Sequence, residues 1–275
     1  MSLISVEDLA ARLADPELAR STTVCDCRFY LADHHKGASE FAAGHIPGAL
    51  FVDVHTDLAG GPGGGRHPLP RVEDFTRLLG RLGISPSTFV VAYDSSSGGT
   101  ASRLWWMLRS IGHGQVAVLD GGYPAWVAAG QRVTAEVTTP ATTEYPAVDE
   151  WTGIVDADAV AEGVALGATL VDSRAHDRFR GENETVDPVA GHIPGAINVF
   201  HKENIGGDGR LKPVDELAAR FAGIGDSPIV YCGSGVTACH NLLAMSLVGI
   251  ARARLYAGSW SDWIENADRP IAVGD

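Results

Sequence analysis

Cys232 is the residue whose surroundings most clearly indicate chemistry. It ends the apolar run SPIVYC and opens the glycine-rich stretch CGSGVTACHNLL, whose later part has helical character. Gly233 and Gly235 allow successive backbone N–H groups to point inward at a helix N-terminus, and such a cradle favours a thiolate over a thiol. It would equally stabilise a persulfide anion or bind an incoming anion. The alternative is a buried cysteine at a strand end followed by a glycine turn. The predicted loop residues are Gly233, Ser234, Gly235, Val236 and Thr237.

The other three cysteines fit packing better than chemistry. They are too few and too scattered for a disulfide framework. Cys25 and Cys27 lie two apart in an expected strand and therefore point to one face, and no CxxC or HxxxH pattern supplies further metal ligands. Cys239 lies two helical turns after Cys232 and is expected to be buried, with a resolving-thiol role as the alternative.

Length and charge set limits on the architecture and on the partners. A chain of 275 residues exceeds the usual single domain, so two domains are expected. The formal charge of −13 repels phosphate backbones and anionic membranes, so we expect neither nucleic acid nor a membrane as a partner. The N-terminus lacks a signal-peptide pattern, and no apolar run approaches the roughly 20 residues that span a bilayer. We therefore expect a soluble, cytoplasmic protein, in which any anionic substrate requires cations near its site.

An internal repeat divides the chain into two similar halves. Four blocks recur in the same order: TVCDCR as TLVDSR, FAAGHIPGALFVD as PVAGHIPGAINVF, FVVAYD as PIVYC, and GGYPAW as GSWSDW. Four ordered matches indicate a duplicated domain. We expect domains at 1–133 and 153–275, joined by a linker at 134–152 that is rich in threonine, proline and alanine.

Strand-like and helix-like segments alternate within each half. This order predicts an α/β fold in which each domain is a mostly parallel sheet with helices on both faces. Ser5 and Asp8 form a pattern like a capping box before an amphipathic run to Leu13. The expected helices beyond this one cover 72–83, 100–112, 123–129, 156–166, 214–222 and 236–248. The expected strands cover 23–27, 88–93, 115–120, 169–172, 228–231 and 253–256.

The cysteine loop, the two GHIPGA segments and the two aromatic-rich endings resemble the tandem-domain rhodanese family over nearly the whole chain. The resemblance implies an N-terminal domain without catalytic cysteine, and here Asp94 stands where the second half has Cys232. It implies a double displacement. The thiolate takes sulfane sulfur from a small anionic donor, thiosulfate or 3-mercaptopyruvate, and the persulfide passes it to cyanide, a thiol or a dithiol protein. No metal or organic cofactor is expected.

The resemblance also bears on the donor. The loop CGSGVT is similar to that of 3-mercaptopyruvate sulfurtransferases, in which a serine works with a histidine and an aspartate of the first domain. Ser234 and His67 match the first two. His55 stands at the aspartate position, and Asp53 or Asp57 is the alternative support for His67.

Arginines are the expected donor-binding groups, because a guanidinium fork suits a carboxylate or sulfonate. Arg178 matches an arginine shared by both branches of the family, with Arg174 on the same segment. The alternative for Arg178 is a surface pair with Asp177 or Glu182. The second arginine of the mercaptopyruvate branch has no counterpart, and Arg180 is the candidate to replace it. The loop favours 3-mercaptopyruvate and the missing arginine argues against it; we expect 3-mercaptopyruvate as the donor.

Other interpretations fit the sequence less well. A cysteine phosphatase needs a loop arginine for phosphate, and no Arg or Lys lies between Cys232 and Asn241. A non-catalytic rhodanese module for protein binding or sulfur sensing would be expected to have lost the cysteine or the loop glycines. His45 and His192 occupy identical GHIPGA turns, which indicates a shared structural role.

Overall fold

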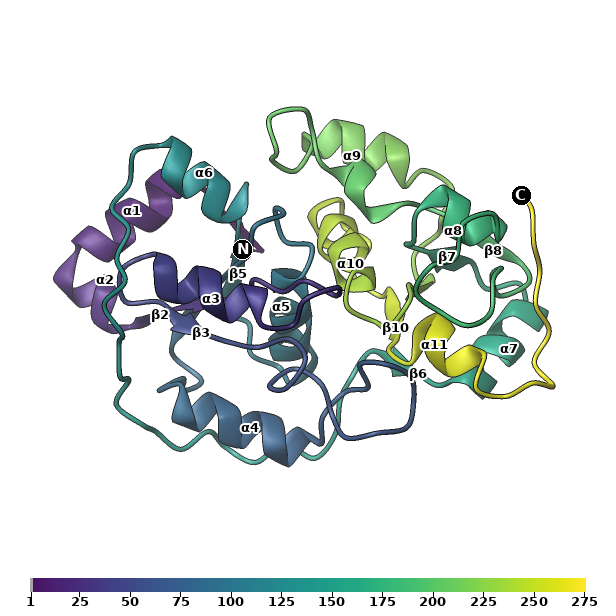
Figure 1. Ribbon diagram of the computed structural model, residues 1–275, viewed down its shortest axis with the longest axis horizontal. Helices are drawn as coiled ribbons and strands as arrows, with labels where there is room; N and C mark the ends of the chain where they lie inside the picture. Colours follow the sequence, from purple (N-terminus) through teal and green to yellow (C-terminus); the bar gives the residue numbers. More distant parts are fainter. Residues whose placement is uncertain (1) are drawn as a thin grey trace. The chain divides into compact units, whose positions relative to one another are not determined.

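The computed structural model describes residues 2–275, which divide into two compact units (Figure 1). The first unit contains 2–59, 70–152 and 207–211, and the second contains 60–69, 153–206 and 212–275. The segment expected as a linker, 134–152, is irregular and belongs to the first unit. The sequence-based boundaries gave residues 60–69 to the first domain, whereas their contacts gather them with the second unit. His67 therefore lies in the same unit as Cys232.

The first unit is built on a parallel five-stranded sheet. Its strand order is β1-β5-β4-β2-β3, and every pair is parallel. The strands are β1 (Leu3–Ile4), β2 (Thr22–Asp26), β3 (Leu50–Phe51), β4 (Phe89–Tyr93) and β5 (Val116–Leu119). The helices are α1 (Val6–Ala14), α2 (Pro16–Arg20), α3 (Lys36–Ala43), α4 (Val72–Arg81), α5 (Ala101–Ser110) and α6 (Gly122–Ala128).

Helices cover both faces of this sheet because its central strands are apolar on both sides. Val91 and Tyr93 of β4 pack with α1, α3 and α6 on one face. Helix α5 packs against β4 and β5 on the other. The expected cap of the first helix is confirmed, since Ser5 Oγ accepts the N–H of Asp8 at 3.0 Å.

The second unit repeats the same plan. Its strand order is β6-β10-β9-β7-β8, again with parallel pairs only. The strands are β6 (Ile154–Val155), β7 (Leu170–Asp172), β8 (Ala196–Asn198), β9 (Ile229–Tyr231) and β10 (Arg254–Tyr256). The helices are α7 (Ala157–Ala165), α8 (His176–Arg180), the 3-10 helix η1 (His201–Asn204), α9 (Val214–Arg220), α10 (Ala238–Leu247) and α11 (Ser259–Trp263). The expectation of two parallel-sheet domains with helices on both faces is confirmed.

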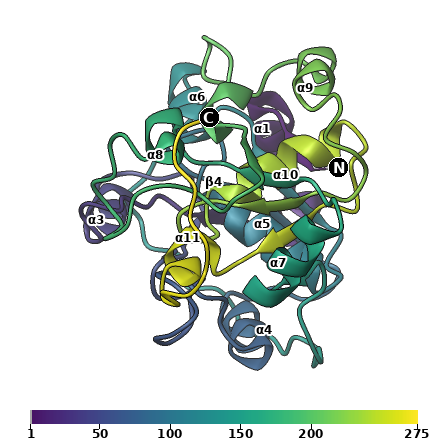
Figure 2. The same cartoon turned by 90° about the vertical axis from the view of Figure 1, so that its right-hand side faces the viewer.

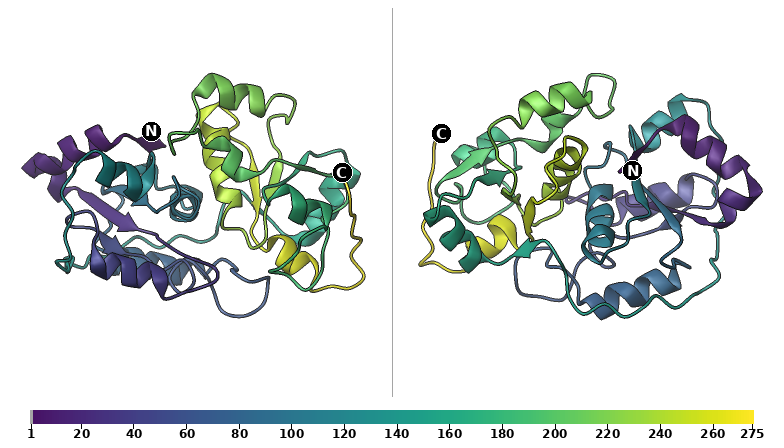
Figure 3. Two further views of the ribbon diagram at one scale, coloured as in Figure 1. Left: turned by 45° about the horizontal axis from the view of Figure 1, so that its top comes forward. Right: turned by 180° about the vertical axis from the view of Figure 1, so that it is seen from behind.

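Helices cover both faces of the central strand β9 in this unit. Helices α7 and α11 pack on one face through Val160, Trp260 and Trp263. Helix α10 packs on the other face, with α9 beside it (Figure 3). The chain after α11 returns past α8, where Gly274 N–H donates to the carbonyl of Arg180 at 3.0 Å (Figure 2).

The repeated GHIPGA turns have the same contacts in both units. His45 Nδ1 lies 2.8 Å from the Phe41 carbonyl oxygen and stacks on the Phe41 ring. His192 makes the same two contacts with Phe179, also at 2.8 Å. The structural role expected for both histidines is thereby confirmed.

Candidate active site

Cys232 follows β9 directly, at the carboxyl end of a parallel sheet, and the loop after it ends where α10 begins at Ala238. Sites assemble at this edge in open parallel sheets. The start of α11 fixes the loop: Cys232 N–H donates to Ser259 Oγ at 3.1 Å, and the Cys232 carbonyl accepts the Trp260 N–H at 3.0 Å. Residue Cys232 is 2% exposed. The backbone on both sides of the sulfur is therefore held in place by α11.

Gly235 is required by the path of the loop. Its φ of +72° is a left-handed conformation that side chains disfavour, and a Cβ there would lie 2.3 Å from the carbonyl oxygen of Ala257. At Gly235 the loop therefore lies so close to the Ala257 carbonyl, after β10, that no side chain fits there.

The two halves use this loop differently. In the first unit the carboxylate of Asp94 accepts four backbone N–H groups at 2.6–3.0 Å. In the second unit, within the described residues 2–275, five loop N–H groups make no hydrogen bond to a protein acceptor. The four donors to Asp94 are Ser96, Gly98, Thr100 and Ala101. The five groups of the second loop are those of Gly233, Ser234, Val236, Thr237 and Ala238. Loop amides bind a carboxylate in the first half, whereas these five N–H groups of the half that has the cysteine have no protein acceptor among residues 2–275.

His67 and Ser234, which are 167 positions apart, meet in the second unit. His67 Nδ1 lies 2.9 Å from Ser234 Oγ, and both residues are buried. The Asp53 carboxylate accepts the backbone N–H of His55 at 2.7 Å. The Asp57 carboxylate accepts the backbone N–H of Asp53 at 2.9 Å. Burial, followed by the charge of Asp53, raises the pKa of Asp57 despite the hydrogen bond from the Asp53 backbone. Support of His67 by any of these three residues stays a prediction.

Two guanidinium groups lie beside the residue that follows Cys232. A Cβ at Gly233 would lie 3.0 Å from Nη2 of Arg66 and 3.7 Å from both terminal nitrogens of Arg178. Arg178 Nη2 donates to Asp187 at 2.8 Å, and Arg66 Nη1 donates to the other oxygen of the same carboxylate. Arg178 Nε donates to Glu184 at 2.9 Å. The partners proposed for Arg178 from the sequence, Asp177 and Glu182, are not its side-chain partners.

Arg174 lies in the framework of the fold. Its guanidinium forms a buried pair with Asp172, at 2.7 Å, and donates to the Gly191 carbonyl. Arg28 and Asp26 form the same pair in the first unit, which has no cysteine in its loop. The arrangement therefore belongs to the duplicated fold. Arg174 does approach the site indirectly, since its Nη1 is 3.6 Å from Glu184.

Arg180 pairs with Glu182 at 2.8 Å near the surface, whereas the guanidinium groups beside Gly233 are those of Arg66 and Arg178. The sequence did not predict that Arg66 and Asp187 lie beside Arg178 and the cysteine loop. The available signal was the position of Arg66 directly before His67.

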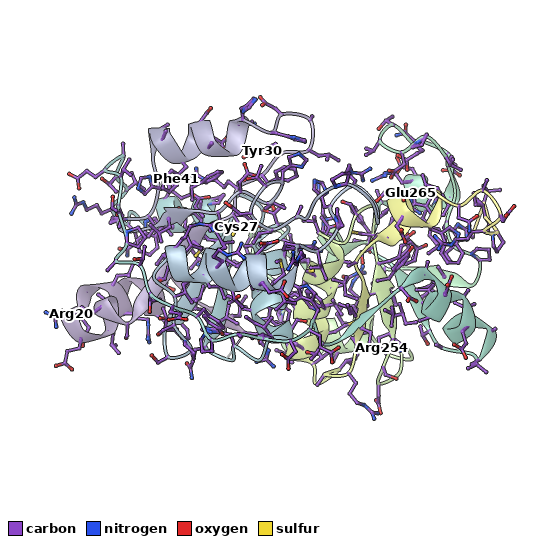
Figure 4. All side chains as sticks on the ribbon, turned by 90° about the horizontal axis from the view of Figure 1, so that it is seen from below. Arg20, Cys27, Tyr30, Phe41, Arg254 and Glu265 are labelled. Carbon is purple, nitrogen blue, oxygen red and sulfur yellow. The ribbon has the colours of Figure 1, made fainter. Side chains whose placement is uncertain are left out.

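All four cysteines are free thiols. Burial, with the charge of Asp26 second, raises the pKa of Cys25 to about 12, and burial raises that of Cys27 well above its ordinary value. Figure 4 shows Cys27 among the interior side chains of the first unit. Within residues 2–275, no cluster of three or more His, Cys, Asp or Glu side chains is suited to a metal ion, and no helix is long and apolar enough to cross a membrane.

A family model described as a rhodanese-like domain matches residues 5–129 and 156–266, one match in each half. The chain belongs to the rhodanese family. It is 42% identical over 283 residues to a Pseudomonas aeruginosa protein named "Probable 3-mercaptopyruvate sulfurtransferase", covering 99% of this chain and 98% of that one. It is 33% identical to the thiosulfate sulfurtransferase of Gallus gallus, covering 97% and 94%. The solved 3-mercaptopyruvate sulfurtransferase from Leishmania major superposes with a TM-score of 0.85 at 28% identity, covering 98% of this chain and 75% of that one.

Proposed function

We propose that this rhodanese-family chain is a sulfurtransferase that carries sulfane sulfur as a persulfide on Cys232. The observation that supports this most directly is the contrast between the two loops. The first loop directs four N–H groups at the carboxylate of Asp94, whereas the second has donors without acceptors around a cysteine. Donors of this kind stabilise an anion on the sulfur, as thiolate or as persulfide.

The reaction consists of two displacements. The Cys232 thiolate attacks the sulfur of 3-mercaptopyruvate, a new S–S bond forms, and the C–S bond breaks with its electron pair leaving on pyruvate, which takes up a proton. With thiosulfate, the S–S bond of the donor breaks instead and sulfite leaves. A nucleophilic acceptor (a thiol, a dithiol protein or cyanide) then bonds the outer sulfur and returns the thiolate. Both steps are nucleophilic substitutions at sulfur and need no metal or organic cofactor.

We assign Ser234 and His67 to the proton that pyruvate requires. The hydrogen bond of 2.9 Å between them gives the hydroxyl a partner that can resupply its proton. Thiosulfate needs no such proton, because sulfite leaves as a stable anion. This difference favours 3-mercaptopyruvate as the donor.

We assign Arg178 to the anionic end of the donor, and Arg174 to a positioning role through Glu184. We also propose a cytoplasmic setting, since four free thiols suit a reducing compartment.

The test is a turnover assay with cyanide as acceptor and either 3-mercaptopyruvate or thiosulfate as donor. Wild type is expected to turn over both and to prefer 3-mercaptopyruvate. Cys232→Ser should abolish turnover, and Cys27→Ala, a matched change at a buried cysteine of the first unit, should retain it. Absence of turnover by wild type with either donor, or full activity of Cys232→Ser, refutes the proposed function. A clear preference for thiosulfate refutes the donor assignment alone.

A further inference from the structure

We propose that Arg66 is a second donor-binding residue of this site, and that Asp187 positions it against Arg178. The proposal rests on the proposed function and deepens it, because it assigns the carboxylate of the sulfur donor to a pair of guanidinium groups. Arg66 comes from the 60–69 segment, far in sequence from the α8 region that supplies Arg178.

Arg66 and Arg178 share one carboxylate. The Asp187 side chain is 1% exposed and accepts hydrogen bonds from both arginines, one on each oxygen. Arg178 also pairs with Glu184, so two guanidinium groups face two carboxylates, and the cluster offers a donor charged N–H groups without a net excess of positive charge. Held by that carboxylate, the two groups are brought together instead of repelling one another into solvent.

Each of the two arginines keeps a terminal nitrogen beside the cysteine loop. In the part of the chain that the structure describes, no protein acceptor bonds to Nη2 of Arg66 or Nη1 of Arg178. Both atoms lie within 3.7 Å of the Cβ position at Gly233, the residue directly after Cys232. The arginine side chains are 24% and 20% exposed, so an anion can reach them.

The backbone at Arg66 is anchored to α11 and the residues that follow it. Its backbone N–H donates to Ser261 Oγ at 2.9 Å, and the preceding Gly65 N–H donates to Glu265 at 3.2 Å. Figure 4 labels Glu265 next to the end of α11. The same helix holds the backbone of Cys232 through Ser259. One short helix therefore ties the cation and the nucleophile to a common frame, which limits the entropy lost when a donor binds.

The arrangement fits a small carboxylate with its sulfur a few bonds away. A carboxylate can accept one N–H from each guanidinium while the sulfur end lies toward the cysteine loop. It also supplies the local cations that a chain of charge −13 requires for an anionic substrate.

The experiment compares alkylation of Cys232 by iodoacetate and by iodoacetamide, two reagents of similar size that differ in charge. In both reactions the thiolate carbon–sulfur bond forms as the carbon–iodine bond breaks and iodide leaves. The ratio of the two rate constants reports the positive charge near the sulfur and does not depend on sulfur transfer. Arg66→Met should lower the iodoacetate-to-iodoacetamide ratio about fivefold, from the loss of one nearby charge. It should also raise KM for 3-mercaptopyruvate about tenfold with little change in kcat, since one charge-assisted hydrogen bond is lost.

Two further variants keep the test decisive. Arg66→Gln retains a donor for Asp187 and should lower the ratio as Arg66→Met does, even where the methionine variant folds poorly. Arg71→Met removes an exposed arginine of the first unit that pairs with Glu73, and should leave the ratio unchanged. An unchanged ratio in Arg66→Gln overturns the proposal. A lowered ratio in an enzyme that transfers no sulfur from any donor supports the anion site and refutes the proposed function instead.

Discussion

Replacing Gly235 by alanine tests whether the shape of the cysteine loop is set by one close approach. The new methyl group would meet the Ala257 carbonyl oxygen at 2.3 Å, more than 1 Å inside ordinary contact, at a φ of +72°. The left-handed backbone costs a side chain roughly 1–2 kcal/mol, and forced overpacking costs roughly 1–3 kcal/mol more. We expect Gly235→Ala to lower the free energy of unfolding by about 3 kcal/mol. A loop shift of about 1 Å at the sulfur should lower kcat about a hundredfold.

Gly249→Ala is the matched control for this change. Gly249 has a φ of +86°, and no atom lies within 4 Å of its Cβ position, so alanine there meets the backbone cost alone. It should lower the free energy of unfolding by about 1 kcal/mol and leave kcat unchanged. Urea unfolding and sulfur-transfer rates of both variants measure the difference. Equal destabilisation of the two, or an active Gly235→Ala enzyme, contradicts the role given to the close contact.

Three other predictions concern the buried polar groups. Asp94→Ala removes the acceptor of four loop N–H groups, two of them buried, and should destabilise the first unit by about 3–5 kcal/mol. Urea unfolding with hydrogen exchange of the loop amides measures this, and wild-type stability would refute the account of that loop. Cys25 and Cys27 should resist iodoacetamide in the native protein, because their raised pKa values keep them as thiols, while Cys232 is alkylated; peptide mapping that finds all three labelled at equal rates contradicts this. Burial raises the pKa of Glu184, but hydrogen bonds from Arg178 and the 186–187 backbone outweigh it and lower the pKa below its ordinary value. Its stabilising contribution is thus complete above the unfolded pKa and lost as the pH falls through the folded one. Glu184→Gln should therefore be less stable than wild type at about pH 7 in urea unfolding, and the difference should shrink as the pH is lowered toward about 3; a constant difference contradicts the sign.

Repeats and local patterns made the fold predictable from the sequence. The duplicated blocks predicted two α/β units, and a cysteine between an apolar strand and a glycine-rich helix start predicted the loop at the sheet edge. The Ser5 cap could also be predicted from the sequence, because a helix cap depends on residues only a few positions apart. These features depend on periodicity and local chemistry, which a sequence carries directly.

Two residues of the proposed anion site, Arg66 and Asp187, could not be predicted from the sequence in the same way. Arg66 and Asp187 meet across 121 positions, and no local pattern encodes such a contact. Arg174 illustrates the opposite case, since its partner Asp172 lies two residues before it. The D-x-R spacing occurs in both halves, including the one without a loop cysteine, and that repetition was the available sign of a structural pair.

The most direct measurement is the mass of the Cys232 peptide after brief incubation with 3-mercaptopyruvate and no acceptor. A gain of one sulfur atom on that peptide is predicted, lost again when cyanide or a thiol is added, with Cys25, Cys27 and Cys239 unchanged. Pyruvate release in the absence of any sulfur on Cys232, or sulfur held on another cysteine, would contradict the account.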